Sequence, residues 1–343
     1  MFDINHAFPE EFAMIEHDIA VQGPAGPLAG TLMVPDGPGP HPAALILGGS
    51  GPLDRDGNVK RVSLNVSRDL ARLLGAQGWA SLRFDKRGVG SSAGEYLPTG
   101  FWDELADASA ALDWLAARPE VGPVIAVGHS AGASMAAELA AGEVAGGGVA
   151  GGEVAGGEVA GGGTGRVRLV GAVLLAATAK TGEETLVWQA QEVAKTLPGL
   201  ARFVLRVMRT DVATQQRKVL DRVRGSSQDV IRVQGARLNA RWMREFMAYD
   251  PMPALRAASV PLLAVTGSKD VQVDPADLAT IASAASTAET RLLKDVDHIL
   301  RHEPAPVSNV QRYKKQAQNP MDPRVEACIV DWLASLPVGA PDA

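Results

Sequence analysis

The chain has 343 residues, 46% of them hydrophobic and 21% charged, which predicts an ordinary globular protein with one large domain or two smaller ones. Its net charge of −6 argues against a general nucleic-acid binder, and its single cysteine, Cys328, excludes an intrachain disulfide and a cysteine-based metal site. No uninterrupted apolar run reaches the ~18 residues of a membrane-spanning helix. The first residues lack the basic and apolar regions of a secretion signal. We therefore expect a cytoplasmic protein.

The N-terminal part of the chain alternates between strand-like and helix-like segments. Residues 11–22 and 28–34 surround a Gly/Pro turn and predict an antiparallel hairpin at a sheet edge. The continuous apolar runs at 42–47 and 79–84 are typical of parallel strands that are covered on both faces. Helices are expected at 59–77 and 101–118. This order predicts an α/β protein with a mostly parallel sheet and right-handed crossovers.

The next strand runs into Gly128-His129-Ser130-Ala131-Gly132 and then into an alanine-rich helix. A serine at the apex of a strand–turn–helix, with a glycine two places to either side, is the nucleophile-elbow pattern G-x-S-x-G. The turn strains the serine backbone and exposes the hydroxyl, and a Cβ at either glycine would collide with the neighbouring strand and helix. We therefore predict that Ser130 is a nucleophile, and that His129 is a packing or supporting residue.

Two segments interrupt the alternation after the elbow helix. Residues 142–165 repeat the unit EVAGG and predict a surface loop, most simply a tolerated repeat expansion. After an apolar strand at 167–178, residues 179–256 look helical throughout and carry 14 Lys/Arg against 8 Asp/Glu, a local charge of +6. We expect them to form a helical cap inserted into a core of residues 1–178 and 257–343. The candidate substrate contacts on this cap are Trp188, Phe203, Trp242 and Phe246.

The rest of the chain supplies the partners that a nucleophilic serine requires. The remaining elements are expected at 261–266, 275–287, 290–295 and 323–336. A serine hydroxyl needs a base to take its proton and a carboxylate to orient that base, both from loops at the carboxyl ends of later strands. Asp270 and His298 each follow such a strand and are our candidates. The alternatives are Asp274, which resembles an N-cap, Asp250, which precedes the strand, and His302 as the base.

Acyl transfer also requires backbone N–H donors that are held ready for the developing oxyanion. One donor should be Ala131, directly after the nucleophile. The other should come from the loop GGSGPLDRDGN, whose glycines let the backbone approach a substrate. We assign Ser50, with Gly49 as the alternative. A phosphate-binding role for this loop is disfavoured because it lacks the terminal Gly-Lys-Ser/Thr of a P-loop.

Five segments together resemble a known family: GHSAG, GGSGPLDRDGN, RFDKRGVGSS, GSKDVQV and DHIL. They are similar to those of α/β-hydrolase esterases whose oxyanion loop reads GSGPxDRDGN, relatives of the dienelactone-hydrolase and prolyl-oligopeptidase-like serine hydrolases. The resemblance covers most of residues 28–337 and implies the α/β-hydrolase fold, carboxylester hydrolysis, a cap over the active site and no cofactor. By position it implies Ser130 as nucleophile, Asp270 as acid and His298 as base. It also implies a structural charge network formed by Asp54, Arg55, Asp56, Asp85 and Arg87.

These observations predict a serine carboxylesterase that hydrolyses short-to-medium acyl esters through an acyl-enzyme. An acyl-CoA thioesterase or a serine peptidase with the same triad is the alternative, since the +6 segment could attract a charged substrate. A relative that binds a ligand without hydrolysing it is a third hypothesis, which the presence of all three triad residues disfavours. We expect no metal and no nucleic-acid or membrane partner, and the sequence predicts no oligomeric state.

Overall fold

The computed structural model describes residues 13–142, 169–196 and 212–337, and the strands described there form an eight-stranded sheet and a separate two-stranded hairpin. The strands of the large sheet are β1 (Met14–Gly23), β2 (Gly26–Pro35), β3 (His41–Leu47), β4 (Ala80–Phe84), β5 (Val121–His129), β6 (Gly171–Leu175), β9 (Leu262–Gly267) and β10 (Ala288–Leu293). Their spatial order is β1-β2-β4-β3-β5-β6-β9-β10. The pairs β1–β2 and β2–β4 are antiparallel, and every pair from β4 to β10 is parallel. The predicted mostly parallel sheet with an antiparallel edge hairpin is confirmed.

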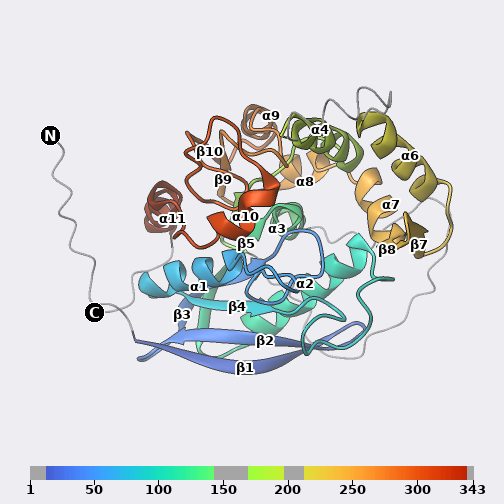
Figure 1. The fold of residues 1–343 in the computed structure, drawn as a ribbon. Coiled ribbons are helices and arrows are strands. Elements are labelled where there is room, and N and C mark those ends of the chain that lie inside the picture. Colours follow the sequence, from blue (N-terminus) through green and yellow to red (C-terminus); the bar gives the residue numbers. More distant parts are fainter. Residues whose placement is uncertain (1–12, 143–168, 197–211, 338–343) are drawn as a thin grey trace, which may run out of the picture.

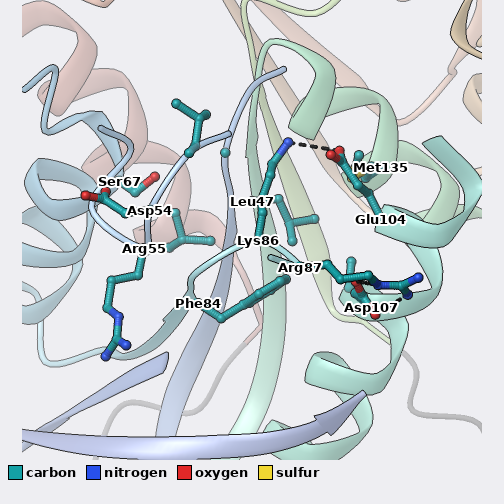
Figure 2. A pocket seen from close by; sticks show the side chains of 14 residues that line it. Leu47, Asp54, Arg55, Ser67, Phe84, Lys86, Arg87, Glu104, Asp107 and Met135 are labelled. Carbon is teal, nitrogen blue, oxygen red and sulfur yellow. Dashed lines mark hydrogen bonds and ion pairs between the residues drawn. The ribbon is translucent and has the colours of Figure 1, made fainter. Parts of the chain in front are cut away.

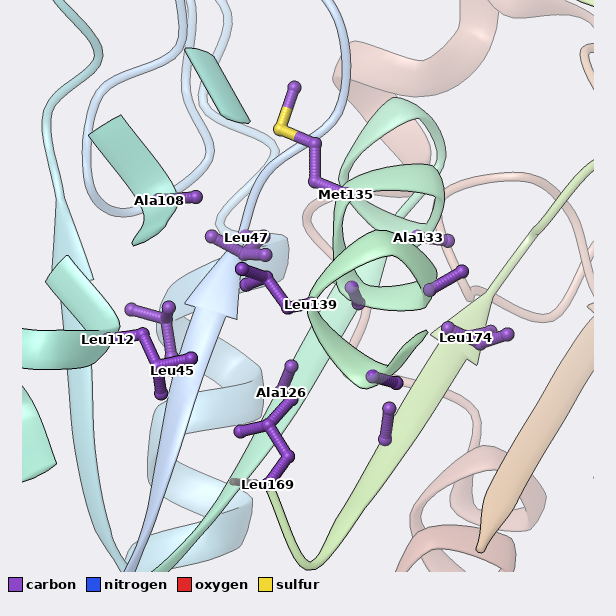
Figure 3. Close-up of a cluster of buried hydrophobic side chains, with 14 of the residues drawn as sticks. Leu45, Leu47, Ala108, Leu112, Ala126, Ala133, Met135, Leu139, Leu169 and Leu174 are labelled. Atoms are coloured by element: carbon purple, nitrogen blue, oxygen red, sulfur yellow. The ribbon is translucent and has the colours of Figure 1, made fainter. Parts of the chain in front are cut away.

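Helices cover both faces of this sheet (Figure 1). They are α1 (Val66–Ala76), α2 (Phe101–Ala116), α3 (Ala131–Ala141), α9 (Asp277–Ala284), α10 (Tyr313–Gln316) and α11 (Pro323–Ser335), with the short 3-10 helix η1 (Val310–Arg312). Strand β3 is apolar from Pro42 to Leu47 because its side chains enter both layers. Leu45 and Leu47 pack with α2 and α3 on one face, whereas Ala44 and Ile46 pack with α1 on the other. Figure 3 shows the first face, with Leu112 of α2 beside Leu45.

The parallel strands end at one edge of the sheet, and the loops that follow them form a rim. We use this name for residues 48–58 after β3, 85–92 after β4, Ser130 after β5, 268–274 after β9 and 294–303 after β10. Open parallel sheets place their ligand sites at this edge, because the chain there is free to vary while the strands below hold it. The rim therefore brings together segments that are far apart in the sequence.

Between β6 and β9 the chain leaves the sheet and forms an insert, described at residues 176–196 and 212–261. Its elements are α4 (Gly182–Lys195), α6 (Val212–Arg224), β7 (Val230–Val233), β8 (Ala236–Asn239), α7 (Ala240–Ala248) and α8 (Met252–Ala257). A small buried cluster of its own consists of Leu220, Val223, Ile231, Ala240 and Met247. In Figure 1 helices α4, α6 and α7 lie at the upper right, away from the β1–β2 hairpin at the bottom.

The expectation that residues 179–256 are helical throughout is wrong at 230–239, where β7 and β8 form an antiparallel hairpin. Strand β7 is rich in β-branched residues, and the two-residue turn of the hairpin, Gln234-Gly235, has both φ angles positive, at 49° and 84°. Such turns match the twist of a tight hairpin and cannot occur within a helix. The helix expected at 59–77 likewise begins only at Val66.

Some sequence predictions fall where the structure describes no residues. The glycine-rich repeat from residue 143 onward lies outside the described residues, and so does Phe203 with the apolar stripe around it. Of the helices that are described, none combines the length and apolarity needed to cross a bilayer.

Candidate active site

The turn between β5 and α3 holds Ser130 in an unusual backbone conformation. Its φ and ψ angles are 56° and −123°, a region that a non-glycine residue adopts only at a cost of about 1–3 kcal/mol. Two hydrogen bonds fix this conformation: the Ser130 N–H donates to the carbonyl of Leu175 on β6 at 2.9 Å, and the Ala133 N–H donates to the Ser130 carbonyl at 2.8 Å. The strand and the helix thus hold the serine at the apex that the sequence predicts.

The two elbow glycines are required by close packing. A Cβ on Gly132 would lie 2.2 Å from the carbonyl oxygen of Leu47 at the end of β3, and a Cβ on Gly128 would lie 2.1 Å from the carbonyl oxygen of Gly132. Real Cβ atoms do not approach backbone oxygens so closely, so larger residues would push α3 away from the sheet. The predicted reason for both glycines is confirmed.

Asp270 and His298, which are 28 residues apart, meet at the rim. The Nδ1 atom of His298 lies 2.7 Å from Oδ2 of Asp270, and the Asp270 side chain is completely buried. Its other oxygen, Oδ1, accepts the backbone N–H groups of Gln272 at 2.7 Å and Val273 at 2.9 Å. Oδ2 therefore accepts the Nδ1 proton of His298, which leaves Nε2 as the ring nitrogen with a free lone pair.

The alternative acids and base occupy other positions. Asp274 accepts the Ala276 N–H at 3.0 Å and pairs with Lys180, although the N-cap of α9 is Ala276 and not Asp274 as the sequence suggested. Asp250 accepts the Met252 N–H at the start of α8. The alternative base, His302, has a largely exposed side chain, 3.9 Å from Asp322. None of these three lines either of the two cavities beside Ser130.

His129 supports the turn that carries His298. Its Nε2 lies 2.8 Å from the His298 carbonyl oxygen, which can only accept, so Nε2 is the protonated ring nitrogen. Burial, followed by the nearby His298 ring, lowers the pKa of His129 to about 3. The ring is therefore neutral at physiological pH. This placement agrees with the supporting position expected from the sequence.

Two cavities flank Ser130. The base cavity, of about 100 Å³, is lined by Ser130, His298, His129, Gly49 and Ser50, and by residues that include Leu64, Ile299 and Tyr313. The insert cavity, of about 50 Å³, is lined by Ser130, Ser50, Ala131, Trp242 and Phe246, and by residues that include Thr185, Leu186 and Gln189 of α4. Ser130, Ser50 and Gln272 line both. The predicted nucleophile, base and oxyanion donors thus line two neighbouring cavities that share Ser130.

The insert contributes fewer of the predicted substrate contacts than expected. Trp242 and Phe246 stack, with ring centroids 4.8 Å apart, and both line the insert cavity. Trp188 lies on α4 but lines neither cavity. The residues of α4 that line the insert cavity are Thr185, Leu186 and Gln189. Phe203 lies outside the described residues.

The loop DRDGN is shaped by its own charges. Asp54 accepts the backbone N–H groups of Asp56 at 3.0 Å and Asn58 at 2.9 Å. The guanidinium of Arg55 donates to both oxygens of Asp85 at 3.2 and 3.0 Å. Burial alone would raise the pKa of Asp85, but the hydrogen bonds from Arg55 and Ser91, together with the Arg55 charge, outweigh it and hold the pKa below its ordinary value. Neither cavity is lined by Asp54, Arg55 or Asp85, which agrees with a structural role.

Sequence reasoning missed three polar residues near the site, two of them at the rim and one on α2. Lys86 and Glu104 form a buried ion pair behind the loop that carries Gly49 (Figure 2). Gln272 lies between the two cavities, and its side-chain oxygen accepts a hydrogen bond of 2.9 Å from Gln189 of the insert. Only the unbroken charge run Asp85-Lys86-Arg87 directly after a buried strand signalled the first pair, and no pattern marked Gln272. Among the described residues, no group of three or more His, Cys, Asp or Glu side chains could hold a metal ion.

Comparison with known proteins places this geometry in context. A family model described as the alpha/beta hydrolase family matches residues 21–310. The esterase EstD of Thermotoga maritima is 25% identical over 328 residues, which span 95% of this chain and 68% of EstD. The structure is similar to the ferulic acid complex of Est1E from Butyrivibrio proteoclasticus, with a TM-score of 0.56, 16% identity, and 92% of this chain and 100% of that chain covered. It is also similar to the esterase Pf2001 of Pyrococcus furiosus, with a TM-score of 0.57, 14% identity, and 97% and 96% covered. At these identities the structural likenesses show the α/β-hydrolase fold alone.

Proposed function

The chain belongs to the alpha/beta hydrolase family, and we propose that it is a serine carboxylesterase that hydrolyses esters of short to medium acyl chains. The observation that carries this proposal is the hydrogen bond of 2.7 Å between Asp270 and His298, at a cavity that His298 and the strained Ser130 both line. The esterase activity that its relatives' names state, and the loop GGSGPLDRDGN of the chain itself, support the same assignment. We propose on the same grounds that it is related to the esterases with a GSGPxDRDGN loop.

The proposed reaction proceeds in two halves. Ser130 Oγ attacks the acyl carbonyl carbon while Nε2 of His298 takes the hydroxyl proton, and Asp270 stabilises the resulting imidazolium through Nδ1–H. The backbone N–H groups of Ala131 and of Ser50, or alternatively Gly49, bind the oxyanion. The bond to the leaving alcohol then breaks, and His298 gives its proton to the alkoxide. In the second half His298 takes a proton from water as the water oxygen attacks the acyl carbon. The bond to Ser130 Oγ then breaks and releases the acid, and His298 returns the proton to Oγ.

The two cavities suggest how the substrate lies. The leaving alkoxide must receive its proton from His298, so the alcohol belongs in the base cavity, which His298 lines. The acyl chain then occupies the insert cavity, whose space of about 50 Å³ beside Trp242 and Phe246 suits a short chain. On this view the insert acts as a cap that selects the acyl group. The core selects the alcohol.

The assignment is tested by Ser130→Ala. We expect kcat for p-nitrophenyl acetate and butyrate to fall by about 10⁶-fold, because no other group can form the acyl-enzyme, while the thermal unfolding temperature stays close to that of the parent. A fluorophosphonate probe should label the parent on the peptide that contains Ser130 and should not label the variant. Turnover that persists in a folded Ser130→Ala protein would remove the proposed nucleophile.

The kind of acyl substrate is tested with a panel of p-nitrophenyl esters, acyl-CoA thioesters and aminoacyl amides at the same enzyme concentration. We expect the highest kcat/KM for the esters. A higher value for acyl-CoA that decreases steeply as salt is added would instead favour a thioesterase, because the positive insert would then attract the phosphates. A preference for the amides would favour a peptidase.

A further inference from the structure

The loop that carries Gly49 and Ser50 is fastened to the core by a buried lysine. The ammonium Nζ of Lys86 donates a hydrogen bond of 2.6 Å to the carbonyl oxygen of Gly49 and a second of 2.9 Å to Oε2 of Glu104. Lys86 is 9% exposed and Glu104 is 5% exposed, so little water competes for these bonds. The Lys86 backbone N–H also donates to the Leu53 carbonyl of the same loop at 3.3 Å. Figure 2 shows Lys86 reaching from the loop after β4 towards Glu104 on α2.

This contact acts on a peptide that faces the nucleophile. A Cβ on Gly49 would lie 3.2 Å from the Cβ of Ser130, so the loop backbone packs directly against the elbow. The carbonyl of Gly49 and the N–H of Ser50 belong to one planar trans peptide and point in opposite directions. A cation that holds the Gly49 oxygen on one side therefore sets the direction of the Ser50 N–H on the other. It also increases the polarity of that N–H, because hydrogen bonds through one peptide polarise each other.

Glu104, on helix α2, is the second hydrogen-bond partner of the Lys86 ammonium. It lies in the first turn of α2, and burial raises its pKa, while the charge and hydrogen bond of Lys86 act in the opposite direction. Its other oxygen, Oε1, is buried without a hydrogen-bond partner, and so is the indole Nε1 of Trp242. The nearby indole N–H also acts to lower the pKa of Glu104. The Glu104 carboxylate thus holds the Lys86 ammonium in place beside the Gly49 carbonyl.

Resting on the esterase function proposed above, we propose that Lys86 is a positioning residue for the oxyanion hole: its ammonium, held by Glu104, binds the Gly49 carbonyl and fixes the Ser50 N–H towards the oxyanion. Lys86 touches neither the substrate nor the reacting atoms. Its contribution appears only when charge develops on the substrate oxygen, and it should therefore affect kcat and leave KM nearly unchanged.

A neighbouring ion pair offers a matched control. Arg87 and Asp107 also join the loop after β4 to α2, with guanidinium–carboxylate bonds of 2.7 and 3.0 Å, and both residues are largely buried (Figure 2). This pair makes no contact with Gly49 among the hydrogen bonds of the described residues. Arg87→Met therefore measures what the loss of a buried ion pair does to the fold, without the loss of the loop contact.

The experiment compares Lys86→Met, Arg87→Met and the double variant Lys86→Met/Glu104→Gln in the full chain. For Lys86→Met we expect kcat for p-nitrophenyl acetate to fall about 10- to 100-fold, less than the roughly 10²–10³-fold that deleting a donor outright costs, with KM within about twofold. The inhibition constant of an aryl trifluoromethyl ketone, which forms an oxyanion on Ser130, should rise by a similar factor. Arg87→Met should lower the unfolding temperature and keep kcat within about threefold of the parent.

The double variant separates positioning from stability. Glu104→Gln removes the carboxylate that Lys86→Met leaves buried and unpaired, so the double variant should regain unfolding temperature while kcat stays low. If kcat recovers together with stability, or if Arg87→Met loses as much kcat as Lys86→Met, Lys86 is merely structural and the inference is wrong. A full kcat in Lys86→Met beside an inactive Ser130→Ala would overturn this inference alone. Activity in Ser130→Ala would overturn the proposed function instead.

Discussion

The rim and the insert both reach Ser130, but different interactions hold them. At the rim the groups that we propose to act on the serine are fixed by directional hydrogen bonds between buried polar atoms, such as those that Asp270 accepts from His298 and from two backbone N–H groups. The insert approaches the same serine with aromatic rings. Trp242 stacks on Phe246, and both pack against Phe101 of α2 with centroids 6.1 and 5.8 Å away.

This difference indicates which of the two regions tolerates amino-acid substitution. A hydrogen bond weakens steeply with angle and distance, and a buried polar group that loses its partner costs about 1–3 kcal/mol, so the rim is intolerant of substitution. Apolar packing is not directional, and side chains of similar volume replace each other at modest cost. We therefore expect the chemistry to depend on the rim and the choice of acyl chain to depend on the insert.

The largest expected effect is that of Asp270→Asn at the rim. The backbone N–H groups of Gln272 and Val273 require an oxygen, so the amide NH₂ of the substituted side chain would face Nδ1 of His298. Nδ1 must then lose its proton and Nε2 must carry it, which leaves no base for Ser130. We expect kcat to fall about 10³- to 10⁴-fold, as in serine hydrolases with the wrong histidine tautomer.

The control for this prediction is Asp274→Asn, which changes a carboxylate of the same rim segment. Asp274 pairs with Lys180 and lines neither cavity, so we expect kcat within about threefold of the parent. The two variants are compared by kcat and by the unfolding temperature. If the two variants lose equal amounts of kcat, activity depends on the conformation of the loop and not on the carboxylate that faces His298.

The next effect concerns acid stability, which we expect to depend on His129 at the end of β5, directly before the rim. Residues 179–256 contain no histidine. The pKa of His129 is about 3 in the folded chain and about 6.5 when unfolded, so the unfolded state binds more protons between these values. This contribution to stability is complete above pH 6.5 and is lost as the pH falls towards 3, roughly 5 kcal/mol in all. In His129→Gln, whose amide can still donate to the His298 carbonyl, the free energy of unfolding should depend less on pH from about 6.5 to about 4.

A residue of the rim gives a control of opposite sign. Burial raises the pKa of Asp297, beside His298, to about 6, so the folded state binds more protons than the unfolded state between about pH 4 and 6. Its contribution makes the protein less stable as the pH rises through that window. Asp297→Asn should therefore steepen the loss of stability on acidification, whereas His129→Gln flattens it. Urea unfolding between about pH 4 and 7 measures both, and slopes that change in the same direction would contradict the assignment.

The sequence predicted those parts of the molecule that have a local cause. The elbow could be found because Gly128 and Gly132 are needed for a close approach that any strand–turn–helix of this kind makes. The positions of Asp270 and His298 followed from the rule that catalytic loops come after parallel strands, and the hydrogen bond between them agrees with it. Strands such as β3 were found because burial on both faces requires a continuous apolar run.

The rest depends on contacts between segments that the sequence does not place relative to each other. Whether Lys86 contacts Gly49 or solvent is decided by the packing of α2 behind the loop. This packing brings Glu104, 18 residues later in the chain, into contact with Lys86. Trp188 and Gln189 are adjacent on α4, and only the rotation of that helix determines that Gln189 lines the insert cavity and Trp188 does not. The β7–β8 hairpin was missed because charged and apolar residues around it also fit a helix.

The smallest expected effect belongs to the insert, in Phe246→Leu. Leucine keeps most of the packing against Trp242 but shortens the side chain at the insert cavity, so the cost in stability should be about 1 kcal/mol, well below that of Phe→Ala. The cavity gains room for about one or two methylenes. We expect the ratio of kcat/KM for p-nitrophenyl hexanoate to that for acetate to rise about tenfold, mainly because the hexanoate value increases.

Arg224→Ala tests whether this selectivity belongs to the cavity wall or to the insert as a whole. Arg224 bonds Glu183 and Asp221 through a side chain that is about half exposed, and such surface pairs contribute little to stability. We expect neither the unfolding temperature nor the chain-length ratio to change measurably. If Arg224→Ala shifts the ratio as Phe246→Leu does, acyl selection depends on how the insert is held over the rim, and the contrast between a fixed rim and an independently adaptable insert is wrong.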